Sequence, residues 1–328
     1  MFRQGADLIL WLQANAAFLI PLMKALTHMG EEWFYILFIP FLYWNLYPAA
    51  GVRLLVLLTA SSFVNAVLKW TFHSPRPYWW DPAVEGMRHE GGFGPPSGHS
   101  QNAVAVWGYL AAVIHRLRPA AWVWPAFLLL AFGISVSRMF LGVHFPHSLL
   151  LGWMIGAAIL IAFLKYSSAV EEWFGRQTTG RQIAWALGTS ALMLLIALVM
   201  YEYVTSRNLQ KIWWENAALD FPDRDIDPIT PKYLINFSAI IAAIGVSTAL
   251  VQRTGMFDPG GSWLLRILRY VLGVAGIIGI QTLFKIATPE EPATLALTLR
   301  YLRYFSMIFW ALWIWPLICM RINLMRPA

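Results

Sequence analysis

Two cations stand seven residues apart at the end of an apolar run, in the stretch Lys69-Trp-Thr-Phe-His-Ser-Pro-Arg76-Pro77. Seven residues make two helical turns, so Lys69 and Arg76 start on the same face of a helix. The prolines beside Arg76 then end the helix and turn the chain. Arginine offers a planar fork of donors and lysine a point charge, so the pair predicts a binding site for a phosphate group.

A second stretch, Pro95-Pro96-Ser97-Gly98-His99, opens the next apolar run. Proline in a first helical turn, followed by Ser97 and Gly98, leaves free backbone N–H groups at a helix N-terminus, and such an end binds anions. His99 at this position is suited to give a proton to a leaving oxygen. By itself this stretch is a weak motif, because it is short enough to occur by chance.

A third stretch, Ser137-Arg138-Met-Phe-Leu-Gly-Val-His144-Phe-Pro-His147-Ser148, adds a cation, hydroxyls and two imidazoles. Imidazole is a nucleophile toward phosphorus and needs no metal for that role. Arg138 alone is typical of a boundary residue that extends its charge to the interface, and His147 alone is typical of a packed polar residue. All three stretches are predicted on one face of a membrane, where such charges are costly, so together they predict phosphoryl chemistry. No cluster of residues has the spacing of a metal site, and we therefore expect no catalytic metal and no cofactor.

The composition places these stretches in a membrane protein. Of the 328 residues, 59% are hydrophobic and 12% are charged, which is about half the charged share of a soluble domain. Apolar runs of about 20 residues, the length that crosses a bilayer, recur along the chain. Many of the 18 Trp stand near the ends of these runs, as in an interfacial belt. The net charge of +7 then reflects basic cytoplasmic loops, so we expect the lipid bilayer rather than nucleic acid as a partner.

We expect an all-α fold, a polytopic helix bundle with about nine transmembrane helices. The candidate spans lie near 31–48, 50–72, 98–115, 120–140, 148–165, 182–201, 233–251, 264–285 and 302–320. The segment 8–28 is apolar but contains Gln13, Asn15, Lys24 and His28. We expect it to lie in the interface or to re-enter the membrane. If it spans the membrane instead, the count is ten.

The expected organisation has three parts. Residues 1–166 form a membrane catalytic core with the three motifs, residues 167–181 form a cytoplasmic linker, and residues 182–328 form accessory transmembrane helices. The loop 202–231 is either a lid or, as we favour, a solvated loop. The side of the linker has eleven Lys/Arg against three acids, and the side of the motifs has thirteen against fourteen. The net positive charge on the linker side favours a cytoplasmic position for the linker and a periplasmic or lumenal position for the motifs.

The order and spacing of the three motifs resemble the type 2 phosphatidic acid phosphatase superfamily, which includes lipid phosphatases, vanadium haloperoxidases and bacterial acid phosphatases. Its pattern is Lys-x6-Arg-Pro, then Pro-Ser-Gly-His, then Ser-Arg-x5-His-x3-Asp. The chain matches the three parts except at the final acid, where Ser148 stands. The resemblance implies the catalytic core of that superfamily.

A closer resemblance, to the glucose-6-phosphatase branch, rests on three strings: Leu68-Lys69-Trp70, Arg76-Pro77-Tyr78-Trp79-Trp80 and His144-Phe145-Pro146-His147. This branch has nine spans, a lumenal site and no acid four residues after its nucleophilic histidine. The resemblance implies that His144 attacks phosphorus and forms a phosphohistidine, and that His99 protonates the leaving oxygen and then activates water. It further implies a phosphate site made of Lys69, Arg76, Ser97, Gly98 and Arg138. The group that orients His144 in place of the usual Asp stays open.

For the substrate, the resemblance favours a phosphomonoester such as a sugar phosphate, hydrolysed by an acid-phosphatase-type phosphoric monoester hydrolase. The alternative is a lipid phosphate or polyprenyl diphosphate that enters between helices. Less favoured is a non-catalytic transporter or scaffold, because both histidines are intact. Possible substrate contacts are Tyr78, Trp79, Trp80, His147 and Ser148. We expect a bacterial inner membrane with the site facing the periplasm.

Overall fold

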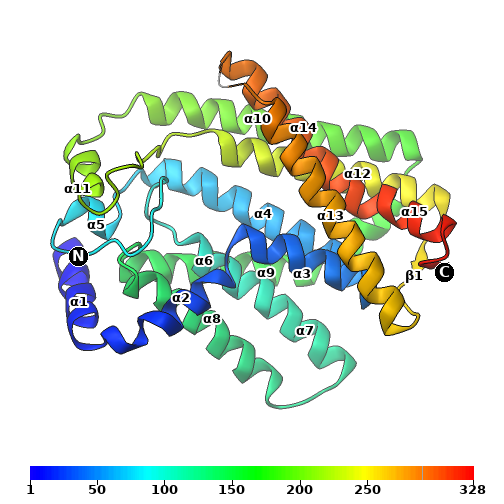
Figure 1. The fold of residues 1–328 in the computed structure, drawn as a ribbon, viewed down its shortest axis with the longest axis horizontal. Helices are drawn as coiled ribbons and strands as arrows, with labels where there is room; N and C mark the ends of the chain where they lie inside the picture. The colour runs from blue at the N-terminus through cyan, green and yellow to red at the C-terminus, as the bar shows by residue number, and fades with distance from the viewer. Residues whose placement is uncertain (290) are drawn as a thin grey trace. The chain divides into compact units, whose positions relative to one another are not determined.

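The computed structural model describes residues 1–289 and 291–328, and most of the chain is helical (Figure 1). The first half contains α1 (Phe2–Asn15), η1 (Ala17–Leu19), α2 (Ile20–His28), α3 (Glu32–Asn45), α4 (Pro48–Phe72), α5 (Pro77–Trp80), α6 (Gly98–Asn102), η2 (Ala103–Trp107), α7 (Gly108–Leu117), α8 (Val123–Phe140) and α9 (Pro146–Gly175). The second half contains α10 (Thr179–Thr205), α11 (Ile212–Asp220), α12 (Lys232–Thr254), α13 (Trp263–Ala287), α14 (Ala293–Phe309), η3 (Trp310–Ile314) and α15 (Trp315–Arg321). The strands β1 (Phe257–Asp258) and β2 (Arg326–Pro327) form one short antiparallel pair. The predicted all-α fold is confirmed.

Seven helices among the described residues are long and apolar enough to cross a bilayer, or up to eight if the bent pair of α1 and α2 forms one span. The protein is therefore an integral membrane protein, but the predicted count of nine spans is not confirmed. Two of the predicted spans account for the difference. In place of 31–48 stands α3, which has only 14 residues. The helix in place of 98–115 begins with polar residues and contains the π-helical segment η2.

The N-terminal segment is a pair of short helices that meet at a bend of 82° (Figure 1). Neither α1, with 14 residues, nor α2, with 9, is long enough to cross a bilayer alone. The pair is either one broken span or a re-entrant segment, so the question that the sequence left open for 8–28 persists. The helix α2 packs along α8, and this contact places its C-terminal end beside the third motif.

By contacts between Cα atoms, the described chain groups into two compact units. Unit 1 consists of Met1–Tyr35, Ala60–Leu164 and Leu198–Thr230, and it contains all three motifs. Unit 2 consists of Ile36–Thr59, Lys165–Ala197 and Pro231–Ala328, and in it α12 packs along α14. Because these units are defined by contacts and not by function, the predicted division of function among 1–166, 167–181 and 182–328 stays a prediction.

Two glycines of α9 allow this helix to lie directly against α6. Gly152 and Gly156 are four residues apart and therefore share a helix face. A Cβ atom at Gly152 would lie 2.7 Å from the carbonyl oxygen of Ser97, and one at Gly156 would overlap the carbonyl oxygen of Gln101. Small residues at this spacing let two membrane helices approach closely. The contact holds the second motif against the helix that follows the third motif.

The loop 202–231 is not the solvated loop that we favoured from the sequence. Its helix α11 packs on α5, and Trp213, Ala217 and Ile226 are at most 7% exposed. The side chain of Asn216 donates a hydrogen bond to the carbonyl oxygen of Trp79 (2.9 Å). The apolar side chains between the acidic residues bury themselves against the first motif, which the acidic run in the sequence concealed.

Candidate active site

The two cations of the first motif meet at one backbone carbonyl. Lys69 lies in the last turn of α4, which ends before Arg76, and Arg76 precedes the first residue of α5. The shared helix face predicted for this pair is therefore wrong, because the chain has already left the helix. Lys69 Nζ donates to the carbonyl oxygens of Phe93 and Gly94 (2.9 Å to Gly94), and Arg76 Nη2 also donates to that of Phe93 (3.2 Å). The loop 81–97 thus brings the two cations together.

Arg76 connects the first motif to the third and is 2% exposed. Its Nε donates to the carbonyl oxygen of Gly92 (2.6 Å) and its Nη1 to that of Val143 (3.0 Å). Nη1 also lies 3.3 Å from His144 Nε2. Because arginine only donates, the histidine nitrogen accepts in this contact. The guanidinium carbon lies 5.8 Å from the centre of the Trp79 ring, in a cation–π arrangement that helps to fix the fork.

A tight turn places His144 beside Arg138. Arg138 lies in the last turn of α8 and is fully buried. Gly142 follows with φ +70°, and a Cβ atom there would overlap the carbonyl oxygen of Glu85, so this position requires glycine. The reversal lets the backbone N–H groups of Val143 and His144 both donate to the carbonyl oxygen of Arg138 (3.1 and 3.2 Å). A predicted phosphate ligand and the predicted nucleophile therefore share one anchor.

The second motif is held from two sides. Ser97 caps α6, and its hydroxyl accepts from the backbone N–H of Ser100 (3.3 Å). The backbone N–H of Ser97 donates to the carbonyl oxygen of Ser148 in α9 (3.0 Å). A Cβ atom at Gly98 would lie 3.0 Å from Asn65 Oδ1, so the start of α6 also lies close against α4. The three motifs thus converge within unit 1.

The imidazole of His99 packs against the turn between α2 and α3. A Cβ atom at Gly30 would overlap the ring of His99, so the absence of a side chain at Gly30 makes room for it. Within the described part of the chain, His99 Nε2 and His144 Nδ1 are buried without a hydrogen-bond partner. Each imidazole keeps one ring nitrogen unpaired.

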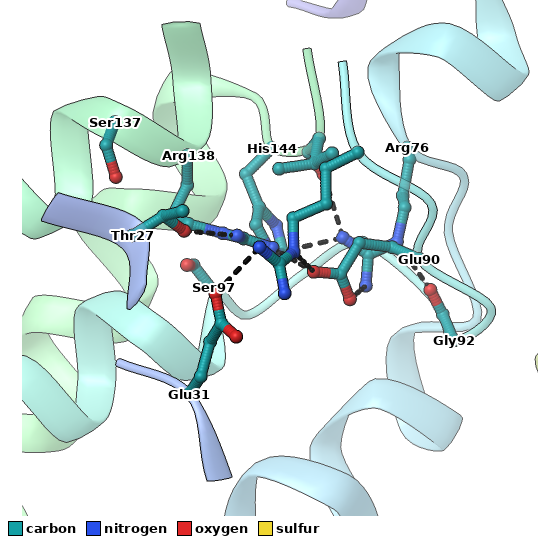
Figure 2. Close-up of polar contacts among 12 residues, drawn as sticks. Thr27, Glu31, Arg76, Glu90, Gly92, Ser97, Ser137, Arg138 and His144 are labelled. Carbon is teal, nitrogen blue, oxygen red and sulfur yellow. Dashed lines mark hydrogen bonds and ion pairs between the residues drawn. The ribbon is translucent and has the colours of Figure 1, made fainter. Parts of the chain in front are cut away.

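Glu90, in the loop 81–97, lies between two of the predicted phosphate ligands (Figure 2). Arg138 Nη2 donates to Glu90 Oε1 in a close ion pair, and Arg76 Nη2 lies 3.6 Å from Oε2. Burial alone would raise the pKa of Glu90, but Arg138 and Arg76 outweigh it and hold that pKa below its usual value. The carboxylate is therefore ionised. Glu90 was not predicted from the sequence. Its one distinguishing feature there is that it is an acid in the glycine-rich stretch before the second motif.

The turn after α2 supplies further acceptors to the arginines. Arg138 Nη1 donates to the hydroxyl of Thr27 (2.6 Å; Figure 2). Arg88 Nη1 lies 2.7 Å from Glu31 Oε1. Arg88 Nε lies 3.7 Å from Glu90 Oε1 and so links this turn to the acid between the arginines. None of these residues was predicted, because Thr27, Glu31 and Arg88 all lie outside the three motifs.

His144 is held in the neutral form. Burial, reinforced by the neighbouring cations Arg76, Lys69 and Arg138, keeps the pKa of His144 well below its usual value. Arg76 contacts the ring at Nε2 and the backbone bond to Arg138 fixes the main chain, but Nδ1 has no partner among the described residues, so the group that would orient the ring from Nδ1 stays open. Ser148 does not take the place of the usual Asp: its hydroxyl is fully buried and has no hydrogen-bond partner among the residues described.

The aromatic residues of the first motif have protein partners. Tyr78 and Trp79 are fully buried. The Tyr78 hydroxyl donates to the carbonyl oxygen of Glu90 (3.2 Å) and accepts from the backbone N–H of Glu90 (3.1 Å). These contacts hold the backbone of the loop 81–97 against α5. Contact of Tyr78 or Trp79 with a substrate stays a prediction.

Trp80 and His147 belong to an aromatic cluster with the N-terminal helix. The Trp80 ring stacks on Phe2 with 5.9 Å between centres, and the His147 ring stacks on Phe145 with 5.3 Å between centres. Phe2 also contacts the edge of His147 (5.4 Å). The start of α1 therefore covers this part of the motifs, and the proposed substrate contacts of Trp80, His147 and Ser148 stay predictions.

Comparison with known proteins places the chain in a family. Residues 50–172 match the PAP2 superfamily, and residues 235–327 match the PAP2 superfamily phosphatase, transmembrane extension. Glucose-6-phosphatase 2 of Homo sapiens is 26% identical over 242 residues, which are 65% of this chain and 65% of that protein. Glucose-6-phosphatase catalytic subunit 1 of Canis lupus familiaris is 28% identical over 170 residues, which are 43% of this chain and 47% of that protein.

Among solved structures, the first transmembrane PAP2 type phosphatidylglycerolphosphate phosphatase from Bacillus subtilis has a TM-score of 0.44 and 23% sequence identity, and covers 52% of this chain and 85% of that one. The chain spans less than two thirds of the length of the curated relatives named above. The resemblance predicted from the three motifs is confirmed by the family matches and by these relatives. The chain belongs to the PAP2 superfamily, and within it the chain is similar to the glucose-6-phosphatases named above.

Proposed function

We propose that this protein is a membrane phosphatase that hydrolyses phosphomonoesters through a covalent phosphohistidine on His144. One observation carries the proposal: His144 Nε2 lies 3.3 Å from Arg76 Nη1, beside the buried Arg138. A neutral imidazole among fixed cations suits attack on a phosphoryl group. The cations stabilise the charge that the group spreads over its oxygens in the transition state.

In the first step the phosphoryl group binds between the motifs. An oxygen that takes the Nη1 donor of Arg76 frees the lone pair of His144 Nε2. Burial and the neighbouring Arg138 lower the pKa of His99, and we propose that the phosphate dianion offsets this cation, so that His99 takes up a proton when the substrate binds. The bond from Nε2 to phosphorus then forms while the bond from phosphorus to the leaving oxygen breaks, and His99 gives that proton to the leaving oxygen. The remaining phosphoryl ligands are proposed from the motifs: Lys69, Arg138, Ser97 and the backbone N–H of Gly98.

In the second step water hydrolyses the phosphohistidine. His99, now neutral, takes a proton from the water as its oxygen attacks phosphorus, and the bond to Nε2 breaks. The chain's own residues supply every charge and proton in this sequence, so we propose no metal and no cofactor. The donor set supports this, since no group of three or more His, Cys, Asp or Glu among the described residues could hold a metal ion.

For the substrate we propose a phosphomonoester of the kind that the glucose-6-phosphatase relatives are named for. A lipid phosphate or polyprenyl diphosphate is the alternative that the same chemistry would serve. We propose a bacterial inner membrane as the location, with the site facing the periplasm. The more basic loops on the opposite side support this orientation.

The test is phosphate release by the purified protein from glucose 6-phosphate, from a phosphatidate and from a polyprenyl diphosphate, with EDTA present. We expect the sugar phosphate to be hydrolysed best and His144→Ala to abolish turnover. The matched control is His115→Ala, because His115 is an exposed histidine at the far end of the same helix as His99. If only the lipid substrates are hydrolysed, the substrate is a lipid phosphate or polyprenyl diphosphate and not a sugar phosphate. Unchanged activity in His144→Ala would exclude the phosphohistidine.

A further inference from the structure

The predicted phosphate site already holds an anion that belongs to the protein. The carboxylate of Glu90 lies between Arg138 and Arg76, with one oxygen toward each (Figure 2). Its side chain is 24% exposed, so it stands at the open side of the fully buried Arg138. A carboxylate and a phosphoryl group present the same kind of oxygen pair to a guanidinium fork.

The Glu90 carboxylate and a bound phosphoryl group would compete for Arg138. Arg138 Nη1 is used by Thr27 (2.6 Å), and Nη2 is used by Glu90. Two anions within about 4 Å of each other repel strongly at the effective dielectric of such a site. A phosphoryl group that takes the Nη2 donor of Arg138 must therefore send the carboxylate elsewhere.

Arg88 provides the place to which the carboxylate can move. Its Nε lies 3.7 Å from Glu90 Oε1, and its side chain is 31% exposed, so it stands further out than Arg138. Glu31 holds it there at 2.7 Å. The backbone of Glu90 is fixed by both hydrogen bonds to the Tyr78 hydroxyl. A rotation of the side chain, without movement of the loop, exchanges one arginine for the other.

We infer that Glu90 is a specificity-determining residue: its carboxylate is the resident anion of the phosphate site, and a ligand binds by displacing it from Arg138 to Arg88. This inference rests on the proposed function. A phosphomonoester dianion that engages Lys69, Arg76 and Arg138 together compensates for the displaced ion pair. A phosphodiester carries one charge and compensates less, so Glu90 selects monoesters over diesters.

The test measures binding of methyl phosphate and dimethyl phosphate at pH 8 by calorimetry, in the full-length protein. In Glu90→Gln the resident charge is gone, and we expect dimethyl phosphate to bind at least about tenfold more tightly than in wild type. The affinity for methyl phosphate should increase by a smaller factor. The control Glu85→Gln removes an exposed acid from the same loop and should change neither affinity.

Weaker binding of dimethyl phosphate in Glu90→Gln would overturn the inference. If Glu90 only orients Arg138, then Glu90→Gln weakens the binding of both ligands. A second variant, Arg88→Met, removes the place to which the carboxylate moves and should weaken methyl phosphate severalfold; unchanged binding there contradicts the displacement. If wild type hydrolyses nothing while Glu90→Gln still tightens diester binding, the proposed function fails and the inference stands. If turnover depends on His144 but Glu90→Gln weakens binding, the inference alone fails.

Discussion

Arg138 in unit 1 and Arg269 in unit 2 are both fully buried, but their partners differ in kind. Arg269 donates from Nε to Asn45 Oδ1 (2.7 Å), from Nη1 to the carbonyl oxygen of Leu324 (3.5 Å) and from Nη2 to that of Pro259. Arg138 donates to a hydroxyl and to the carboxylate of Glu90, and its Nε has no partner within the described ranges.

The difference separates a structural arginine from one that can bind a ligand. Two of the three acceptors of Arg269 are backbone carbonyls, of Pro259 beside β1 and Leu324 beside β2, which cannot leave unless the backbone itself moves. The strongest partner of Arg138 is a side chain on a loop, and a second anion can replace it. Burial is the same in both cases, so the kind of partner, rather than the depth, indicates the role.

Exchanging each arginine for methionine gives the largest effects and tests this comparison directly. For Arg138→Met we expect turnover to fall by about 10² to 10³, because a fixed cation at the reacting group is lost. Its melting temperature should fall by only a few degrees, since the ion pair with Glu90 is lost but Glu90 keeps Arg76 and Arg88 as partners. For Arg269→Met we expect a loss of roughly 3 kcal/mol of stability or more, because buried oxygens lose their donor.

The measurements are phosphate release per folded molecule and the melting temperature in detergent. The Arg269→Met protein that remains folded should keep its turnover. If instead Arg138→Met melts as early as Arg269→Met, both arginines are structural, which contradicts the proposed difference between them. If Arg269→Met loses turnover without losing stability, Arg269 affects the reaction, which contradicts a purely structural role for it.

A smaller effect on turnover is expected from Gly30→Ala, which tests whether the position of His99 in unit 1 matters for the reaction. The added methyl group would overlap the ring of His99 and push it from its position. A displacement of a reacting group by about 1 Å costs up to about 10² in rate, so we expect the turnover rate to fall at least about tenfold. The control is Gly188→Ala in α10, where an added methyl group meets nothing within 4 Å. Equal activity of the two variants would place His99 away from the reaction.

The predictable part of the site consists of residues that are unusual where they stand. Lys69, Arg76 and Arg138 are charges beside apolar runs, and a charge there is costly enough to need a function. Their types and order were sufficient to predict the superfamily and the convergence of the motifs. Apolar runs of about 20 residues were sufficient to predict most of the spans, since this length crosses a bilayer.

The residues that the sequence did not reveal act through contacts between distant, irregular segments. Thr27 and Glu90 contact Arg138 across 111 and 48 positions, and Asp220 accepts from the backbone N–H of Gly86 across 134 positions. No helical or strand period connects such positions, so no pattern predicts the pairing. Arg269 was overlooked for the same reason, because its acceptors come from three separate segments.

The smallest predicted effect concerns acid, because only one of the two buried arginines has a partner that titrates. The pKa of Glu90 in the folded protein lies below its usual value of 4.5, so its ion pair adds stability above that pH. This stability is lost progressively as the pH falls from 4.5 towards the lower pKa of the folded state, because Glu90 takes up its proton in the unfolded chain first. In Glu90→Gln the loss is absent, so its melting temperature should fall by a few degrees less than that of wild type between pH 7 and pH 3. The neutral partners of Arg269 make no such contribution, and Glu85→Gln should follow wild type. Equal falls in wild type and Glu90→Gln would mean that the Glu90–Arg138 pair does not form in solution, which would remove the resident anion and the contrast with Arg269 together.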